Sequence, residues 1–297
     1  MLVVKEVHEE LIVPVKEFLG QQEDFGLSRN WDPVFQYPWK LADYPYGYAI
    51  LDGDKIAGFL GTMFSRRSVA GKDVIFCNMT SWIMGAEYRA MRLGSKLLNP
   101  ILESETLLIT NLTPVAAYRK SYEKMGFQVL EREQISIPVI PWLTSATNGG
   151  SNGREQLLTF DDDEIQAGLN ESDRKIFLDH KGLPCVHFLI RQRDSARYCY
   201  GIATTSLVNK LRFMGAKLLN VCYLSDTDLF VRSLKLFKKH LWAYGRVVFL
   251  RYDSRLLSAQ LSAIEFRNQG LRLFRSNGIA SRDVDNLYTE LITFNKF

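Results

Sequence analysis

The chain has 297 residues, of which 46% are hydrophobic and 24% charged; this composition supports a sizeable core and excludes a largely disordered protein. Its net charge of +4 suits an anionic ligand but is too small to be typical of nucleic-acid binding. Four cysteines without paired short spacing predict reduced core residues rather than a zinc site or disulfides. Because neither a cationic, apolar leader nor a run of about 18 apolar residues occurs, we expect a soluble cytoplasmic protein without membrane contacts.

The first half of the sequence predicts alternating helices and strands. A helix is expected over residues 6–20, followed by an aromatic segment over 31–47. The pair Asp52 and Gly53 lies between two runs of alternating apolar residues, which indicates a β-hairpin. A strand, a helix, a strand, a helix and a strand should then follow over residues 73–84, 90–103, 105–111, 114–126 and 127–140.

The composition changes at residues 144–156, where Gly, Ser, Asn and Thr replace apolar residues. We therefore predict a domain over 1–142, a linker over 143–156 and a second domain over 157–297. The second half repeats the outline of the first, which indicates an α/β (α+β) protein of two tandem domains; a chance recurrence of common elements is the alternative. Its helices and strands are expected at 161–180, 186–192, 197–203, 217–225, 226–245, 246–253 and 286–294.

Residues 88–98, YRAMRLGSKLL, follow a predicted strand and lead into a helix. The first N–H groups of a helix have no internal partners, and the helix dipole adds partial positive charge there. An anion is therefore favoured at this place, and Arg89 and Arg92 add formal positive charge. This pattern predicts a site for a phosphate-bearing cofactor.

These residues resemble the signature of the GNAT acetyltransferase superfamily, which reads Arg or Gln, two residues, Gly, one residue, and Gly or Ala. Arg89 and Gly94 match its ends, whereas Arg92 occupies the middle glycine. The resemblance implies a mixed central sheet flanked by helices and a loop that wraps the pyrophosphate of acetyl-CoA or another acyl-CoA. The cofactor contacts that it implies are Trp82, Ile83, Met84, Arg89, Arg92, Leu93, Gly94 and Ser95.

A second motif, ITNLTPVAAYRKSYEKMGF at residues 109–127, is similar to the strand and helix that follow in the same superfamily. The resemblance implies that Asn111 contacts the cofactor and that Tyr122 protonates the departing thiolate. A packed tyrosine on an amphipathic helix is the alternative for Tyr122, and Tyr118, one turn earlier, is a weaker candidate. The resemblance covers residues 2–139.

The later half lacks an arginine- and glycine-rich loop. Asp226 and Asp228 stand where the cradle should follow, and they would repel a pyrophosphate. We therefore expect a degenerate second GNAT-like domain. In the first domain, Arg92 can keep ordinary helical angles if it lies in the first turn of the helix. We therefore expect a modified cradle, that is, a loop that still binds the pyrophosphate. The alternative is a remnant of this loop that no longer binds the cofactor.

No general base can be identified, because the strand at 73–84 carries Asn78 and Ser81 instead of a carboxylate. Water, the aromatic segment or the second domain could serve, and Glu87 is more typical of an exposed turn. The aromatic segment could enclose the acceptor or form a small core under a long loop; its rings are Trp31, Phe35, Tyr37, Trp39, Tyr44 and Tyr46.

Three other patterns have ordinary structural explanations. The acidic run at residues 161–164 fits a helix N-terminus and does not predict a metal site. The four histidines lack ligand spacing. A basic helix with Arg232, Lys235, Lys238 and Lys239 is typical of a solvated face.

We therefore expect an acyl-CoA-dependent N-acyltransferase that acts on a primary amine of a small molecule, with an amino sugar as one candidate acceptor. A non-catalytic binding or scaffold protein and a tRNA-dependent aminoacyl transferase of tandem-GNAT type are the alternatives. No metal is expected, and the sequence leaves the oligomeric state open.

Overall fold

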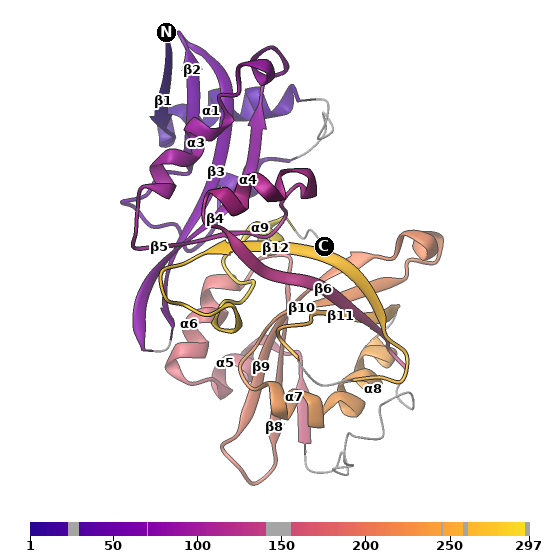
Figure 1. The fold of residues 1–297 in the computed structure, drawn as a ribbon. Helices are drawn as coiled ribbons and strands as arrows, with labels where there is room; N and C mark the ends of the chain where they lie inside the picture. The colour runs from indigo at the N-terminus through magenta and orange to yellow at the C-terminus, as the bar shows by residue number, and fades with distance from the viewer. Residues whose placement is uncertain (23–29, 70, 141–155, 245, 258–260, 295–297) are drawn as a thin grey trace. The chain divides into compact units, whose positions relative to one another are not determined.

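The computed structural model describes residues 1–22, 30–69, 71–140, 156–244, 246–257 and 261–294. Contacts divide the chain into two compact units. The first consists of Met1–Leu130, Leu271–Val284 and Tyr288–Phe294, and the second contains Glu131–Gly270 and Asp285–Leu287. The units therefore differ from the continuous division expected near residue 142, because the C-terminal segment folds with the first unit (Figure 1).

The first unit is built on a mixed sheet. Its strand order is β1-β2-β3-β4-β5-β12, and only β4 and β5 run parallel. The strands are β1 (Leu2–Glu6), β2 (Gly47–Asp52), β3 (Lys55–Val69), β4 (Lys72–Met84), β5 (Leu107–Asn111) and β12 (Phe266–Arg275). The helices are α1 (Glu9–Gly20), α2 (Asp32–Phe35), α3 (Gly94–Leu102), α4 (Arg119–Lys124) and α9 (Glu290–Thr293), with 3-10 turns at Ala86–Met91 and Ala116–Tyr118.

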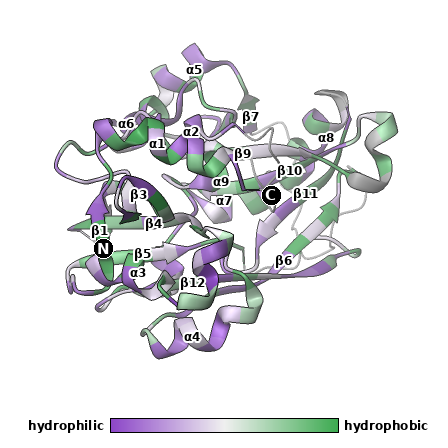
Figure 2. Ribbon diagram, turned by 90° about the horizontal axis from the view of Figure 1, so that it is seen from above, coloured by the Kyte–Doolittle hydropathy of each residue, from purple (hydrophilic) through white to green (hydrophobic). Residues whose placement is uncertain are grey.

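Two apolar clusters cover the two faces of this sheet. On one face, α1 buries Val15, Phe18 and Leu19 while its first turn carries Glu9 and Glu10, so that hydrophobic and hydrophilic residues alternate along it (Figure 2). On the other face, α3 and α4 contribute the residues Leu97, Leu98, Ile101 and Tyr122. The two faces therefore hold different helices and can host different chemical groups.

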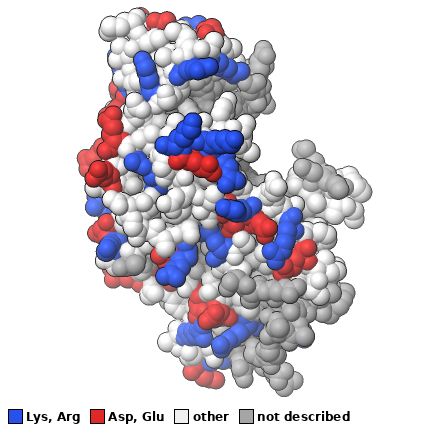
Figure 3. Space-filling model, in the orientation of Figure 1, with Lys and Arg blue, Asp and Glu red and all other residues white. Residues whose placement is uncertain are grey.

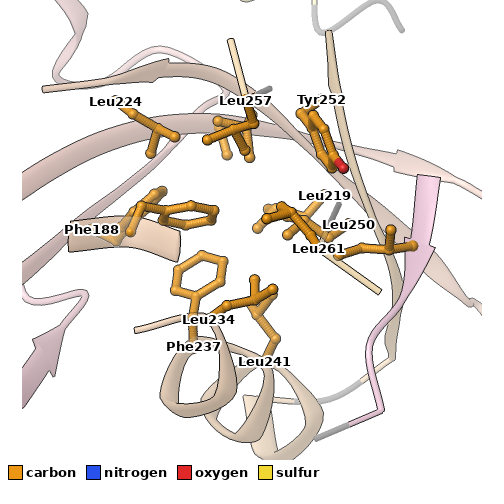
Figure 4. Close-up of a cluster of buried hydrophobic side chains, with 14 of the residues drawn as sticks. Phe188, Leu219, Leu224, Leu234, Phe237, Leu241, Leu250, Tyr252, Leu257 and Leu261 are labelled. Atoms are coloured by element: carbon orange, nitrogen blue, oxygen red, sulfur yellow. The ribbon is translucent and has the colours of Figure 1, made fainter. Parts of the chain in front are cut away.

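The second unit contains the strands β6-β11-β10-β9-β8-β7 in this order, with β10 and β11 parallel. Its strands are β6 (Gln128–Pro138), β7 (Gln156–Thr159), β8 (Val186–Gln192), β9 (Tyr198–Leu207), β10 (Lys217–Leu224) and β11 (Val247–Asp253). Its helices are α5 (Asp162–Gly168), α6 (Glu171–His180), α7 (Thr227–Arg232) and α8 (Leu234–Tyr244). Phe188, Phe237 and leucines of β10, β11 and α8 fill its core (Figure 4).

The two units share one strand plan. Each sheet begins with three antiparallel neighbours in chain order, continues with a fourth strand and places a parallel fifth strand beside it. The sixth strand comes from the other half of the sequence: β12 pairs with β5 in the first unit, and β6 pairs with β11 in the second. Each half of the chain thus completes the sheet of the other half.

Several sequence predictions are confirmed and others are wrong. Gly53 and Gly126 adopt left-handed angles at the predicted hairpin and helix end, with φ of 61° and 85°. Asp161 caps α5 by accepting the N–H groups of Asp163 and Glu164, as the acidic run indicated. The prediction of a solvated face for the basic helix is wrong for one residue, because Lys238 is fully buried.

Five elements differ from the expected ones. β1 and β12 were not predicted, and the expected strand at 286–294 instead contains α9. The expected helices at 161–180 and 226–245 are each two helices, α5 with α6 and α7 with α8. The predicted linker at 143–156 lies outside the described residues except Gln156, which begins β7.

Candidate active site

The candidate site begins where β4 and β5 separate. The two strands pair in parallel from Ile75 with Leu107 to Asn78 with Thr110. Beyond Asn78, β4 continues to Met84 without a β5 partner, while β5 ends at Asn111. We call this unpaired stretch of β4 the gap, and its start at Asn78 and Thr110 the vertex.

A bulge shapes the free end of β4. Thr80 pairs with Gly61 and Ile83 with Phe59, so Ser81 and Trp82 together lie opposite the single residue Leu60. Ser81 has a left-handed φ of 52°. Such a bulge re-aims the side chains that follow it. Trp82 consequently packs with the α3 and α4 cluster, while Ile83, the next residue, packs with the α1 and α2 cluster.

Trp82 forms the centre of the α3 and α4 side of the gap. Its ring centroid lies 5.9 Å from that of Tyr122 and 6.4 Å from that of Tyr118. A Cβ at Gly94 would lie 3.2 Å from the indole, so glycine permits this close approach. The indole Nε1–H is buried, and no hydrogen-bond partner for it lies within the described residues. This N–H is therefore able to donate to a ligand placed beside it.

Tyr122 lies beside Trp82 and is only 3% exposed. Burial raises its pKa to about 12, although the polar side chain of Asn111 lowers it. The phenol is therefore protonated at neutral pH, as a proton donor must be. Tyr118, the weaker candidate, is 55% exposed and contacts Trp82 instead.

The segment between β4 and α3 carries the predicted phosphate cradle. Arg89 and Arg92 are both exposed, and Arg89 Nε donates to the Met84 carbonyl oxygen over 3.2 Å. α3 begins at Gly94 with no side-chain cap, and its first turn contains no acidic residue. The N–H groups at this helix end thus remain available to an anion.

The expected backbone angles of Arg92 are wrong. Arg92 does not lie in the first turn of α3 but between the 3-10 turn and α3, and its φ and ψ of 54° and 32° are left-handed. This is the conformation for which glycine is preferred. The side chain therefore occupies a strained position that the family signature reserves for glycine, at a cost of about 1–2 kcal/mol.

The other expected cofactor residues fall into two groups. Trp82 packs against Tyr122 and lies close to Gly94, and Asn111 acts on the Tyr122 hydroxyl. Ser95 is exposed at the start of α3. The Leu93 side chain belongs to the core, and that of Ile83 lies on the opposite face of the sheet. Met84 packs over Gly58. For these last three residues only backbone groups can face a cofactor in the gap.

Sequence reasoning missed a polar network on the opposite face. Glu290, in the first turn of α9, accepts hydrogen bonds from Asn78 Nδ2 and from Thr113 Oγ1, the latter over 3.1 Å. Thr110 Oγ1 donates to Asn78 Oδ1 over 3.1 Å. Glu290 is 1% exposed, and burial raises its pKa, with Arg272 opposing that rise. A lone Glu in the apolar run LYTELITF was the available signal.

The aromatic segment forms a core. Trp31, Tyr37 and Trp39 are at most 6% exposed, which favours the structural alternative over an open acceptor wall. Trp31 packs edge-on to Phe294, and Trp39 packs on Tyr288. These rings therefore hold the C-terminal segment that carries Glu290.

A pocket of about 550 Å³ reaches the segment between β4 and α3 from the α1 side. It is lined by the end of α1, the β2–β3 turn and residues from Gly85 to Arg89, including the ion pair of Lys55 with Glu87. Neither Trp82 nor Tyr122 lines it. Its carboxylates Glu17, Asp54 and Glu87 disfavour a phosphate, so the gap between β4 and β5 is the better site.

Among the residues that the structure describes, the other titratable groups form no competing centre. Cys185 lies 3.5 Å from His187 Nε2, but burial raises the pKa of this thiol to about 12, which leaves it unreactive. Within the described residues, no group of three His, Cys, Asp or Glu could hold a metal ion, and no helix is long and apolar enough to cross a bilayer. Basic and acidic side chains alternate on the face drawn in Figure 3.

No protein-family model and no curated protein sequence matches the chain. Solved structures do match it. A GCN5-related N-acetyltransferase from Anabaena variabilis is 15% identical, with a TM-score of 0.61 over 93% of this chain and 72% of that chain. A probable N-acyltransferase of unknown function from Enterococcus faecalis is 11% identical, with a TM-score of 0.60 over 93% and 73%.

A glucosamine N-acetyltransferase region in a fungal multi-domain GH3 beta-N-acetylglucosaminidase is 10% identical to the chain. Its TM-score is 0.55 over 92% of this chain and 38% of that chain. At such identities the likeness establishes the fold. The chain has the GNAT fold, with a mixed sheet flanked by helices, as the two sequence motifs indicated.

Proposed function

We propose that this GNAT-fold protein is an acyl-CoA-dependent N-acyltransferase of the cytoplasm that transfers an acetyl group to a primary amine of a small molecule. The observation that supports this most directly is the gap between β4 and β5, which combines a bulged strand end, the buried Trp82 donor and the protonated Tyr122. These are the groups that acyl transfer from a thioester requires: donors for a carbonyl oxygen and an acid for a thiolate.

The residues present fit an acyl-CoA. Arg89 and Arg92 supply positive charge beside the uncapped start of α3, where a pyrophosphate is favoured. The free end of β4 offers its backbone groups and the Trp82 N–H to the amide and carbonyl groups of the pantetheine arm. The bound acyl-CoA supplies the activated acyl thioester.

Tyr122 serves as the acid in this proposal. Its hydroxyl carries a proton at neutral pH, and the Asn111 amide fixes the hydroxyl and stabilises the phenolate once the proton has left. Because burial excludes water from Tyr122, the proton goes to the leaving sulfur rather than to solvent.

We further propose an amino sugar as the acceptor. The support is the likeness to the fungal glucosamine N-acetyltransferase region. The second unit repeats the strand plan without an open cradle, and we propose that it is a degenerate copy that supports the first unit.

The test is a titration with acetyl-CoA, followed by melting temperature and then by thiol release with glucosamine, spermidine and ethanolamine as probe amines. At a ligand concentration about 100 times the dissociation constant, acetyl-CoA should stabilise the protein by about 2.7 kcal/mol. Thiol release should be fastest with glucosamine. Stabilisation without thiol release for any amine would favour a binding protein, and the absence of both would remove the proposal.

A further inference from the structure

Glu290 links the two strands that separate at the gap. Its carboxylate accepts from Asn78, the last β4 residue paired with β5, and from Thr113, two residues beyond the end of β5. One side chain from the distant end of the sequence thus contacts both β4 and the segment that follows β5. Only its place in the fold, and not its neighbours in sequence, brings it there.

Glu290 and Tyr122 approach the gap from opposite faces. Thr110 and Asn111 are consecutive residues of β5, so their side chains point to opposite faces of the sheet. Thr110 bonds Asn78, which in turn bonds Glu290, whereas Asn111 acts on the Tyr122 hydroxyl and lowers its pKa. The strand therefore has a carboxylate network on one face and a phenol on the other.

A purely structural link would not need a charge at this position. The hydrogen-bond donors to Glu290 are neutral, namely Asn78, Thr113 and its own backbone N–H. Arg272 of β12, 3% exposed, is the charged group that acts on it, and Asp32 on the adjacent α2 is paired with Lys16. A buried carboxylate is costly unless fully paired, and a glutamine could make the same contacts.

The carboxylate is buried, but its hydrogen-bond network reaches the surface through one partner. Thr113, its hydrogen-bond partner, is exposed. A carboxylate offers about four acceptor positions, of which the side chains of Asn78 and Thr113 use two. Acceptor positions therefore remain for a donor that arrives beside Thr113.

We propose that Glu290 is the general base of the reaction, which takes a proton from the ammonium group of the acceptor. The proposal rests on the proposed acyltransferase function and assigns the acceptor to the face of the sheet opposite Tyr122. It explains why a buried acid stands at the vertex, where the bond to the acyl carbon would form.

The protons and electrons balance as follows. An N–H bond of the ammonium breaks, an O–H bond forms at Glu290, and the nitrogen regains its lone pair. That pair forms the C–N bond as the C–S bond breaks, and the sulfur takes the proton of Tyr122. The second proton that the nitrogen loses on becoming an amide restores Tyr122, and Glu290 releases its proton to solvent beside Thr113.

The experiment compares wild type, Glu290→Gln, Glu290→Asp and Thr113→Val in thiol release from acetyl-CoA with glucosamine across pH. Glu290→Gln should lower kcat about 10²- to 10⁴-fold and remove the acidic limb of the pH profile, with an unchanged melting shift by acetyl-CoA. Glu290→Asp should restore part of the rate. Thr113→Val is the matched control, because it removes one hydrogen bond and keeps the carboxylate.

Thr113→Val also keeps the test decisive if Glu290→Gln fails to fold. Loss of a donor to the carboxylate should move the acidic limb toward higher pH, with a kcat change of only a few fold near the optimum. An unmoved limb, or a Glu290→Gln enzyme with wild-type kcat, would overturn the assignment while leaving the acyltransferase intact. A wild type that releases no thiol with any probe amine would overturn both proposals.

Discussion

The segments that connect β4 to α3 and β10 to α7 occupy equivalent places in the two units, but the helices that follow them begin differently. After β4, α3 begins without a side-chain cap, beside two exposed arginines. After β10, Asp226 caps α7 by accepting the N–H of Leu229, and Arg197 binds the same carboxylate through two nitrogens at 2.6 and 2.9 Å. In the second unit the N-terminus of α7 is therefore already occupied by an anionic side chain of the protein, that of Asp226.

The strands before these segments are alike in detail. Asn78 and Asn220 are each the last residue of the fourth strand that pairs with the parallel fifth strand. A bulge follows in both cases, at Ser81 with Trp82 in β4 and at Cys222 in β10. The difference in binding capacity that we propose therefore depends on a few side chains at the helix start and not on the strands.

The largest effect is expected at the acid. Tyr122→Phe should lower kcat for thiol release by about 10²- to 10⁴-fold with little change in acetyl-CoA affinity, because a phenyl ring packs like the phenol but carries no proton. Tyr252 is the matched control from the second unit, since it is also a buried tyrosine whose pKa burial raises. Tyr252→Phe should leave kcat unchanged. Equal rates for the two variants would remove Tyr122 from the mechanism.

A charge reversal at the cradle should have the next largest effect. Arg92→Glu should abolish the stabilisation of about 2.7 kcal/mol that acetyl-CoA gives at 100 times its dissociation constant. Arg246, the control, is also exposed and left-handed, with a φ of 68°, and belongs to the second unit. Arg246→Glu should leave the acetyl-CoA melting shift intact. A shift that survives Arg92→Glu would mean that the phosphates bind elsewhere.

Removal of the internal anion should destabilise the second unit without creating a new site. Asp226→Ala should lower the free energy of unfolding by about 1–2 kcal/mol through loss of the cap. Asp226→Asn keeps a capping side chain and should lose at most about 1 kcal/mol, because the ion pair is partly exposed. Denaturant unfolding measures both, and an equal loss in the two variants would assign the stabilisation to charge alone.

The same residue predicts a pH dependence. The hydrogen bond from Arg197 lowers the pKa of Asp226 below its ordinary value. The stabilisation is therefore fully present above the unfolded pKa of about 3.9 and disappears as pH falls through the lower folded value. Unfolding of Asp226→Asn should be less sensitive to acid than that of the wild type over this range.

The smallest effect concerns backbone strain. Arg92→Gly should raise the free energy of unfolding by about 1 kcal/mol, because glycine adopts left-handed angles without a steric penalty. Arg246→Gly should stabilise by a similar amount for the same reason. A destabilised Arg92→Gly variant would show that the Arg92 side chain makes contacts that outweigh the strain.

The sequence predicts the parts of the site that depend on local pattern. Trp82, Gly94, Asn111 and Tyr122 come from two short motifs, and the structure brings them together. The angles of Arg92 were not predictable in this way, because the same letters fit either a continuous helix or a 3-10 turn followed by a new helix. Tertiary structure, which the local sequence does not encode, selects the 3-10 turn followed by a new helix.

The parts that depend on distant segments could not be predicted. β12 starts with the mostly polar stretch Phe266–Gly270, FRNQG, which shows no strand alternation. Its other end, Leu273–Arg275, pairs with the distant strand β5. Residues 286–294 alternate like a strand yet form a helical turn, because α9 packs on α2. Glu290 is remote in sequence from both motifs, so its role depends on the fold alone.

The exchange of β6 and β12 affects how the protein is made. Domains near the N-terminus usually fold first during synthesis, but the sheet of the first unit lacks its sixth strand until residues 271–275 leave the ribosome. Until then the edge of β5 is unpaired and open to wrong partners. A nascent chain that stops before residue 290 lacks Glu290 as well. Nearly the whole second unit must therefore be synthesised before the first unit has both its sixth strand and Glu290.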